Sequence, residues 1–183
     1  MKALTILSLI LVISNLSFAN IETNITTVST YTDLSTDCIL VSESTDLAPI
    51  DFSTKECKAF GGYTLRESGG DLRYGPELSF QGTAINLQRP SAFHSMGSQK
   101  IEWVYDLEKN KEGFGEIHFK ALIYRLSVAN IDSNGENTKD KSVLFVVRLA
   151  GEKSCLIGRV LTNKDARDLA NSLKSPCSNE NPL

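Results

Sequence analysis

The chain has 183 residues, an apolar fraction of 41% and a formal net charge of −3 at pH 7. This length suits one domain with a sizeable core, and the apolar fraction excludes a wholly disordered chain. The chain is acidic and lacks a basic stripe, which excludes nucleic acid as an expected partner because phosphate binding needs clustered Lys and Arg. After Ala19 no apolar stretch approaches the roughly 20 residues of a membrane helix, so we expect no membrane span.

The first nineteen residues have the pattern of a secretory signal peptide. Lys2 gives a positively charged start, residues 3–13 are almost wholly apolar, and residues 17–19 have the small-x-small form of a cleavage site. We therefore predict a secreted or periplasmic protein, in a compartment where disulfides persist. The predicted organisation is a signal peptide over 1–19, a flexible leader over 20–36 with a short strand near residues 28–31, a single domain over 37–178 and a tail over 179–183.

The first half of the predicted domain carries weak strand signals. Residues 38–41 form a short β-prone run, whereas residues 47–56 contain Pro49 and predict a loop or a single helical turn. The glycines and the aspartate of residues 68–71 predict a turn. Short strands are expected on either side of Pro76, which suits the edge of a sheet.

Strand signals are clear in the second half. Residues 101–107 and 117–123 alternate apolar and polar side chains, the period of a strand with one buried face. From 121 to 126 both faces become apolar, and residues 143–147 have the composition of a buried strand, so both segments should lie centrally. A further strand is expected over 155–161, and polar hairpin loops should connect these segments.

One helix is predicted near the C-terminal end of the domain. Thr162 or Asn163 can cap its N-terminus, Asp165 lies near the positive end of its dipole, and Pro176 stops it. Its apolar face consists of Ala166, Leu169, Ala170 and Leu173. The expected fold class is therefore α+β: an antiparallel β-sheet with a C-terminal helix packed on it, held by two disulfides.

The four cysteines allow three pairings. We favour the two local bridges, Cys38 with Cys57 and Cys155 with Cys177. Each closes a loop of about twenty residues and contributes roughly 3 kcal/mol by restricting the unfolded chain. A zinc site or a redox pair would need a Cys-x-x-Cys spacing, which the sequence does not contain, so we expect no metal and no other cofactor.

No catalytic residue is predicted. His94 lies near Ser91 and Ser95, but neighbours in sequence rarely have triad geometry and no Gly-x-Ser-x-Gly elbow is present. His118 falls on the polar face of a strand, which predicts a solvated side chain. The loop that begins at Asp132 resembles a calcium loop, but its glycine and glutamate fall at the wrong positions.

Four charged residues form a candidate cluster, either structural or ligand-binding: Asp71, Arg73, Glu102 and Arg125. Asp71 and Arg73 point the same way on an extended chain, and Arg125 interrupts an apolar strand. An arginine in that setting needs a carboxylate partner such as Glu102 or Asp71, because an unpaired buried charge is costly. The alternatives are a structural ion-pair network and a pocket in which Arg73 or Arg125 holds an anionic group.

A set of short motifs extends over nearly the whole predicted domain. They are Cys38, Cys57, Gly61-Gly62, Asp71-Leu-Arg73, Glu102-Trp103, residues 121–125, residues 155–158, residues 166–170 and Cys177. Together they resemble a family of small secreted or periplasmic bacterial proteins of unknown function. In that family arginine typically follows the tryptophan, whereas Val104 stands here. The resemblance implies a periplasmic domain with paired cysteines and implies no reaction.

The leading functional hypothesis is a non-catalytic binding or interaction domain, whose partner is a protein or a small ligand. One alternative is a hydrolase that uses Asp71 and Glu102 as paired carboxylates, as glycosidases do. Another is an inhibitor of a secreted enzyme such as a lysozyme, in which residues 68–75 insert into the target. Composition and spacing leave all three hypotheses open.

Overall fold

The computed structural model describes residues 24–44, 51–71, 73–88, 90, 93–109, 113, 115–131, 133–172 and 177. The predicted signal peptide and the predicted tail lie outside these residues. No helix in these ranges is both long enough and apolar enough to cross a membrane.

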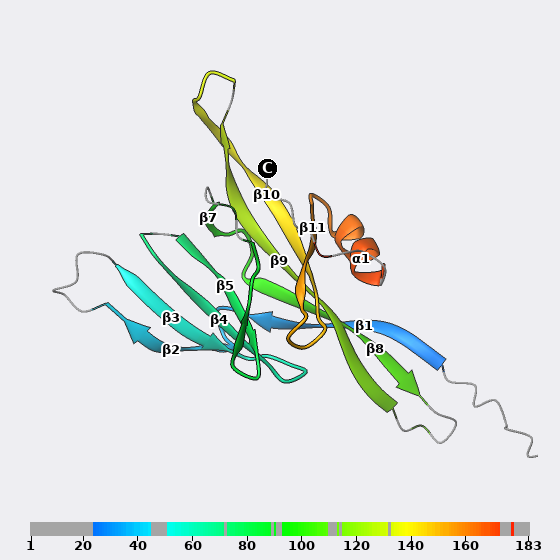
Figure 1. Ribbon diagram of the computed structural model, residues 1–183. Coiled ribbons are helices and arrows are strands. Elements are labelled where there is room, and N and C mark those ends of the chain that lie inside the picture. Colours follow the sequence, from blue (N-terminus) through cyan, green and yellow to red (C-terminus); the bar gives the residue numbers. More distant parts are fainter. Residues whose placement is uncertain are drawn as a thin grey trace, which may run out of the picture.

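The described residues form eleven strands in two antiparallel sheets, together with one helix (Figure 1). The six-stranded sheet has the order β1 (Asn24–Asp33), β8 (Lys100–Lys109), β9 (Gly115–Ile131), β10 (Asn137–Arg148) and β11 (Cys155–Val160), and β7 (Phe93–Met96) pairs with β9. The five-stranded sheet has the order β2 (Cys38–Glu43), β3 (Phe52–Cys57), β4 (Tyr63–Gly70), β5 (Arg73–Phe80) and β6 (Thr83–Ile85).

The predicted α+β class is wrong, because the fold is mainly β. The expected helix forms as α1 (Asn163–Asn171), and Thr162 caps it by accepting a hydrogen bond from the backbone N–H of Asp165. This helix is short, and the second layer of the core is a separate sheet rather than a helix. Many side chains of β2 and β3 are exposed or half-buried, so the sequence there lacks the alternation that indicates a strand with one buried face.

β1 occupies a segment that the sequence predicts as a flexible leader. All ten of its residues pair with β8, from Asn24 opposite Lys109 to Asp33 opposite Lys100. Its Thr and Ser side chains suit an extended strand at the edge of a sheet, where much of the surface stays hydrated. The first described strand therefore begins at Asn24, ahead of residue 37, where the sequence predicts the start of the domain.

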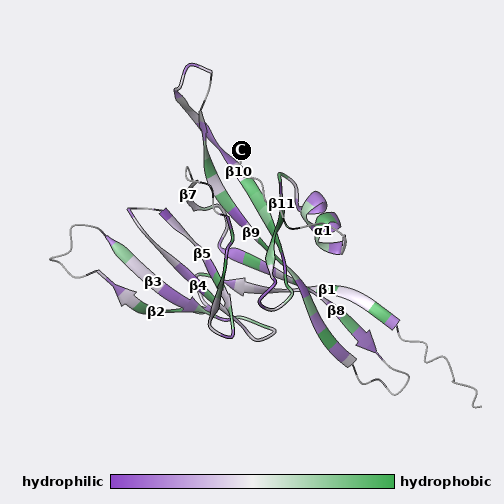
Figure 2. Ribbon diagram, viewed as in Figure 1, coloured by the Kyte–Doolittle hydropathy of each residue, from purple (hydrophilic) through white to green (hydrophobic). Residues whose placement is uncertain are grey.

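The two sheets enclose the main apolar core. Leu65 and Leu78 of the five-stranded sheet pack with Trp103, Leu122 and Phe145 of the six-stranded sheet. Figure 2 shows the apolar run of β10 at the centre of that larger sheet. Because side chains alternate across a strand, the residues next to Trp103, Leu122 and Phe145 in the sequence face the other side of the six-stranded sheet.

We call this other side, which carries α1, the outer face. Val104, Ile123 and Leu144 form a second apolar cluster there with Ala166 and Ala170 of the helix. The helix packs on β9, β10 and β11, so it covers one part of the outer face and leaves β1 and β8 without a helix above them (Figure 1). This partial cover creates a hollow beside the helix.

Both favoured disulfides are confirmed. Cys38 faces Cys57 across β2 and β3, and the bond between them spans 19 residues of sequence. Cys155, at the start of β11, is bonded to Cys177 with a separation of 22 residues, which ties the segment after α1 to the sheet. The two bonds fit a protein of an extracellular or otherwise oxidising environment.

Candidate functional site

Two of the four predicted charged residues lie together. Glu102 of β8 and Arg125 of β9 both line a hollow of about 230 Å³ on the outer face, beside the N-terminal end of α1. We call it the charged hollow. Its described lining consists of Tyr31, Ser98, Lys100, Glu102, Ile123, Arg125, Leu144, Asn163 and Arg167.

The alternation of the strands explains why Glu102 and Arg125 reach this face. Trp103 and Tyr124 are buried between the two sheets, so the residues beside them in sequence point to the outer face. Ile123 and Leu144 belong to the apolar cluster under the helix and also line the charged hollow. The lining therefore combines two nearly buried apolar side chains with charged ones.

Glu102 is held by three hydrogen bonds. Ser29 Oγ donates to Oε1 at 2.6 Å, and Arg167 donates from Nε at 2.9 Å and from Nη2 at 3.3 Å. The hydrogen bonds and the charge of Glu102 raise the pKa of Arg167 above its usual value. Arg167 Nη2 also donates to the Tyr31 hydroxyl at 3.2 Å, which links α1 to both β1 and β8.

Arg125 has neutral hydrogen-bond partners. Its Nη1 donates to Ser142 Oγ and its Nη2 to Asn163 Oδ1, each at 2.9 Å. The sequence predicts a carboxylate partner, Glu102 or Asp71, whereas Glu102 is held by Ser29 and Arg167. Arg125 does not need a carboxylate partner, because it lies on the outer face at the charged hollow, where the core does not enclose its charge.

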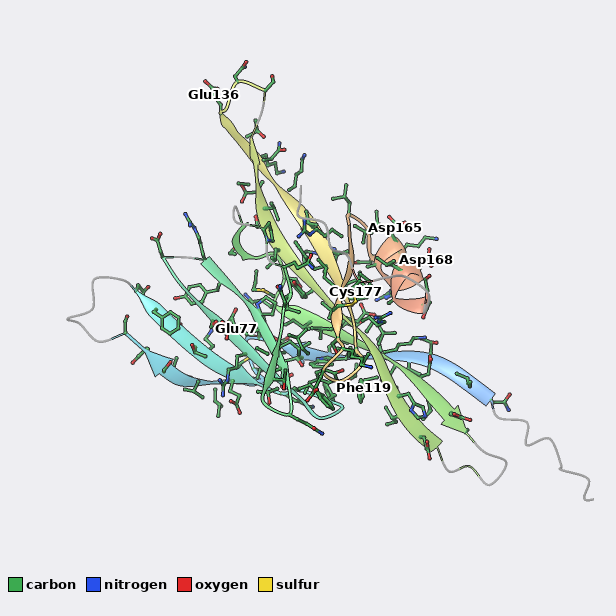
Figure 3. The ribbon with its side chains drawn as sticks, viewed as in Figure 1. Glu77, Phe119, Glu136, Asp165, Asp168 and Cys177 are labelled. Carbon is green, nitrogen blue, oxygen red and sulfur yellow. A yellow bond between two sulfur atoms is a disulfide. The ribbon has the colours of Figure 1, made fainter. Side chains whose placement is uncertain are left out.

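The charged hollow carries an excess of positive charge. Its described lining contains three cations, Lys100, Arg125 and Arg167, and one carboxylate, Glu102. Two acidic side chains, Asp165 and Asp168, lie on α1 (Figure 3). The hydroxyl of Thr162, which caps the helix, donates to Asp165, and Lys164 Nζ donates to Asp168. The lining itself therefore carries more positive than negative charge, opposite in sign to the net charge of the chain, and it favours an anionic group.

Asp71 and Arg73 lie elsewhere. They flank the turn between β4 and β5 in the five-stranded sheet, and both are exposed. Gly69 and Gly70 are required by close backbone contact, since a Cβ on Gly69 would lie 2.0 Å from the carbonyl oxygen of Arg73 and one on Gly70 would lie 2.1 Å from that of Asp51. Gly69 is thus explained by the β4–β5 hairpin, and Gly70 by the close approach of the backbone just before β3.

Sequence reasoning missed Lys100, Arg167, Tyr31 and Asn163. Alternation in β8 places Lys100 on the same face as Glu102, which is a signal that the sequence contains. Arg167 directly follows the apolar residue Ala166 on the helix, and only the docking of α1 brings it to Glu102. The pairing of β1 with β8 brings Tyr31 opposite Glu102.

His118, the histidine whose side chain the structure describes, does not line the charged hollow. His118 Nε2 lies 3.4 Å from Glu116 and 3.8 Å from Glu108 on the β8–β9 hairpin, and its side chain is exposed. In the described ranges no three His, Cys, Asp or Glu side chains are grouped as metal ligands. The side chain of His94 lies outside the described residues.

Comparison of the chain with protein-family models, curated proteins and solved structures finds no match. The resemblance to secreted bacterial proteins therefore gains no support from these comparisons. The two disulfides do agree with the paired cysteines that the resemblance implies. Function must accordingly be argued from the geometry of the site.

Proposed function

We propose that the protein is a non-catalytic binding protein of an oxidising compartment, and that the charged hollow holds the anionic group of a small ligand. The observation that carries this proposal is the setting of Arg125, whose guanidinium is positioned by Ser142 and Asn163. Both partners are neutral, so they orient the charge without neutralising it. A charge held in this way can bind a carboxylate or phosphate group by charge-assisted hydrogen bonds.

The chemistry of the lining supports a ligand with one anionic end. Arginine has five N–H donors, and Arg125 uses two of its nitrogens in the hydrogen bonds to Ser142 and Asn163. Lys100 adds a second charge at the same hollow, and Ile123 and Leu144, which are 3% and 5% exposed, add a small apolar part to its lining. The volume of about 230 Å³ suits a group of several heavy atoms, such as a carboxylated sugar ring or a phosphate monoester.

The cellular location is part of the proposal. Two disulfides favour an oxidising compartment, and the apolar, Lys-led start of the chain supports export. Expression of the whole chain in a secreting host should yield a mature form that begins at residue 20. Intact-mass measurement of the exported protein would contradict this part of the proposal if residues 1–19 were still present.

In the part of the chain that the structure describes, no observation favours the two alternative functions. A paired-carboxylate hydrolase needs Asp71 near Glu102, but these residues lie in different sheets, and Glu102 accepts hydrogen bonds from Ser29 and Arg167. An inhibitor acting through residues 68–75 would use a hairpin whose strands are already paired. Cleavage of a glycan, ester or peptide panel, with activity lost in Asp71→Ala, would overturn the non-catalytic proposal.

Calorimetric titration tests the binding proposal directly. Sodium phosphate, citrate and glucuronate serve as probes against the oxidised wild-type protein, Arg125→Gln, and Arg66→Gln as a matched control. Arg66 is an exposed arginine on the other sheet that pairs with Glu56. We expect at least one probe to bind the wild type and the control alike, and to bind Arg125→Gln about tenfold more weakly, the size of one lost charge-assisted bond. Equal binding to all three proteins would refute the site.

A further inference from the structure

β2 is an edge strand of the five-stranded sheet. It pairs with β3 on one side, and no described strand pairs with it on the other. Figure 1 shows β2 and β3 on the opposite side of the molecule from α1. We propose that the free edge of β2 binds an extended segment of another protein as an added strand, and that this segment has an apolar centre and basic ends.

The backbone of β2 has a definite free edge. Lys58 N–H donates to the carbonyl of Asp37, and Ser44 N–H donates to the carbonyl of Phe52, so Asp37 and Ser44 direct these groups toward β3. Successive residues of a strand direct their N–H and C=O groups to opposite edges. Cys38 and Leu40 therefore direct theirs away from β3, where an added strand can pair with them.

Apolar side chains line this edge on both faces of the sheet. Ile39, Leu40 and Val41 are 70%, 52% and 49% exposed, and Phe52 of β3 is 44% exposed. Natural edge strands usually carry Lys, Pro or an inward-pointing charge that prevents pairing, and β2 has neither Lys nor Pro. The register shift between Leu40 and Ser42 marks a bulge in β2, so an added strand would pair regularly with Cys38 and Leu40 and reach Glu43 beyond the bulge.

The charges around β2 define the ends of the partner segment. Residues 20–54 contain no Lys or Arg, and acidic residues stand at both ends of β2: Asp37 directly precedes it and Glu43 is its last residue. The nearest cations are on or just after β3, where Lys55 pairs with Glu67 and Lys58 lies over the ring of Phe60. Lys or Arg at the ends of an added strand would therefore meet acidic groups of β2.

The same charges argue against a second copy of this chain as the occupant. If two β2 strands paired antiparallel about their centres, Glu43 of each would come next to Asp37 of the other. Like charges placed across neighbouring strands destabilise the pairing. A different protein with basic residues at these places forms the better complement.

The disulfide between Cys38 and Cys57 holds the start of β2 in place before any partner binds. It fixes the first residue of β2 to β3, directly beside the exposed run that begins at Ile39. An edge that is already ordered loses little conformational entropy when a strand is added, so more of the interaction free energy appears as affinity.

Fluorescence polarisation with designed peptides tests the proposal. The probe is a labelled heptapeptide of sequence KITVTVK with blocked ends, and the matched peptides replace both lysines with glutamate or the central valine with proline. We expect the oxidised full-length mature protein to bind the lysine peptide at least about tenfold more tightly than either matched peptide, a difference of about 1.4 kcal/mol. Added salt should weaken the binding, because it screens the end charges.

Protein variants separate the β2 edge from other apolar surface. Leu40→Lys should weaken binding of the lysine peptide about tenfold, whereas Ile117→Lys, at a 56% exposed position of β9, should leave it unchanged. Glu43→Lys should shift the preference toward the glutamate peptide. Absence of saturable binding, tight binding of the proline peptide, or an equal loss in Ile117→Lys would overturn the proposal.

Sedimentation equilibrium tests whether a second copy of this chain, rather than a different protein, occupies the β2 edge. A concentration-dependent dimer that Leu40→Lys abolishes would assign the edge to a second copy and overturn the partner proposed. Peptide binding should also be the same in Arg125→Gln as in the wild type, since the charged hollow lies on the other sheet. This edge proposal and the anion proposal can therefore fail separately.

Discussion

Trp103 Nε1 donates a hydrogen bond of 2.9 Å to Thr32 Oγ1, and both side chains are fully buried. Thr32 Oγ1 in turn donates to the carbonyl oxygen of Lys58 at 2.7 Å. This chain of two bonds joins β1, β8 and the segment that follows β3, so it connects the two sheets through the core. The end of β1 is therefore part of the cooperative fold.

Thr32→Val should lower the free energy of unfolding by about 1–3 kcal/mol, because it leaves the buried Trp103 N–H and the Lys58 carbonyl without this partner. Thr32→Ser, which keeps the hydroxyl, should recover most of the loss. Thr26→Val, at an exposed position of the same strand, is the control. Urea unfolding followed by tryptophan fluorescence measures all three, and a Thr32→Val protein as stable as the control would contradict the role given to β1.

Each disulfide should contribute stability of its own. Replacing Cys155 and Cys177 together by alanine should lower the free energy of unfolding by roughly 3 kcal/mol, and the same double change at Cys38 and Cys57 should cost a similar amount. Chemical denaturation at equal protein concentration checks both values. Four free thiols in protein isolated from its own compartment, as counted by mass spectrometry after alkylation, would contradict the pairing.

Asp106 makes the stability of the fold depend on pH. Burial acts to raise the pKa of this carboxyl, but hydrogen bonds from Lys120 and Thr27 outweigh it and hold the pKa below its usual value of 3.8. Because the folded pKa is the lower one, the stabilisation is present above pH 3.8 and is lost as the pH falls through the lowered pKa. Asp106→Asn should therefore be less stable than the wild type at pH 7.

Urea unfolding at pH 7 and at pH 2 measures this difference in stability. The gap between wild type and Asp106→Asn should narrow as the pH falls below 3.8 and through the lowered pKa, because protonation of the wild-type carboxyl removes the same charge. Asp71→Asn, a change at an exposed turn residue, controls for loss of net charge. A gap that stays constant between the two pH values would show that the substitution acts through packing instead.

The ion pair between Glu102 and Arg167 sets the charge of the hollow. Glu102→Gln removes the single described carboxylate of the lining, so we expect the anion probes to bind several-fold more tightly. Stability should fall by only about 0–1 kcal/mol, because Arg167 is half exposed. Glu56→Gln, which breaks a similar Arg–Glu pair on the other sheet, is the matched control. Unchanged or weaker binding in Glu102→Gln would contradict an electrostatic role for the hollow.

Prediction succeeded where one face of a strand is buried. The alternation around Trp103 and the apolar run around Phe145 correspond to β8 and β10, and the capped helix forms as α1. Prediction of β1 reached only a short strand near residues 28–31, and prediction failed at β3, because the polar residues of these strands resemble a leader and a loop. Their stability comes from pairing with distant strands, a contribution that a local pattern does not contain.

The candidate site shows the same division. Glu102 and Arg125 were singled out because charges within apolar strands are unusual, and they share one hollow. Asp71 and Arg73 were grouped with them on sequence spacing alone, yet the hairpin places them in the other sheet. The cation that meets Glu102 is Arg167, which lies 65 residues away in the sequence.

By itself the sequence determined the local pairing of the cysteines, the central strands and the closing helix, because each depends on neighbours within a short stretch of chain. Only the tertiary structure decided that two sheets enclose the core, that a polar N-terminal strand belongs to the larger sheet, and that three cations and one carboxylate line one hollow beside α1. The physical reason is that strand pairing and helix docking join residues far apart in sequence, and the free energy of those contacts depends on geometry that composition does not record.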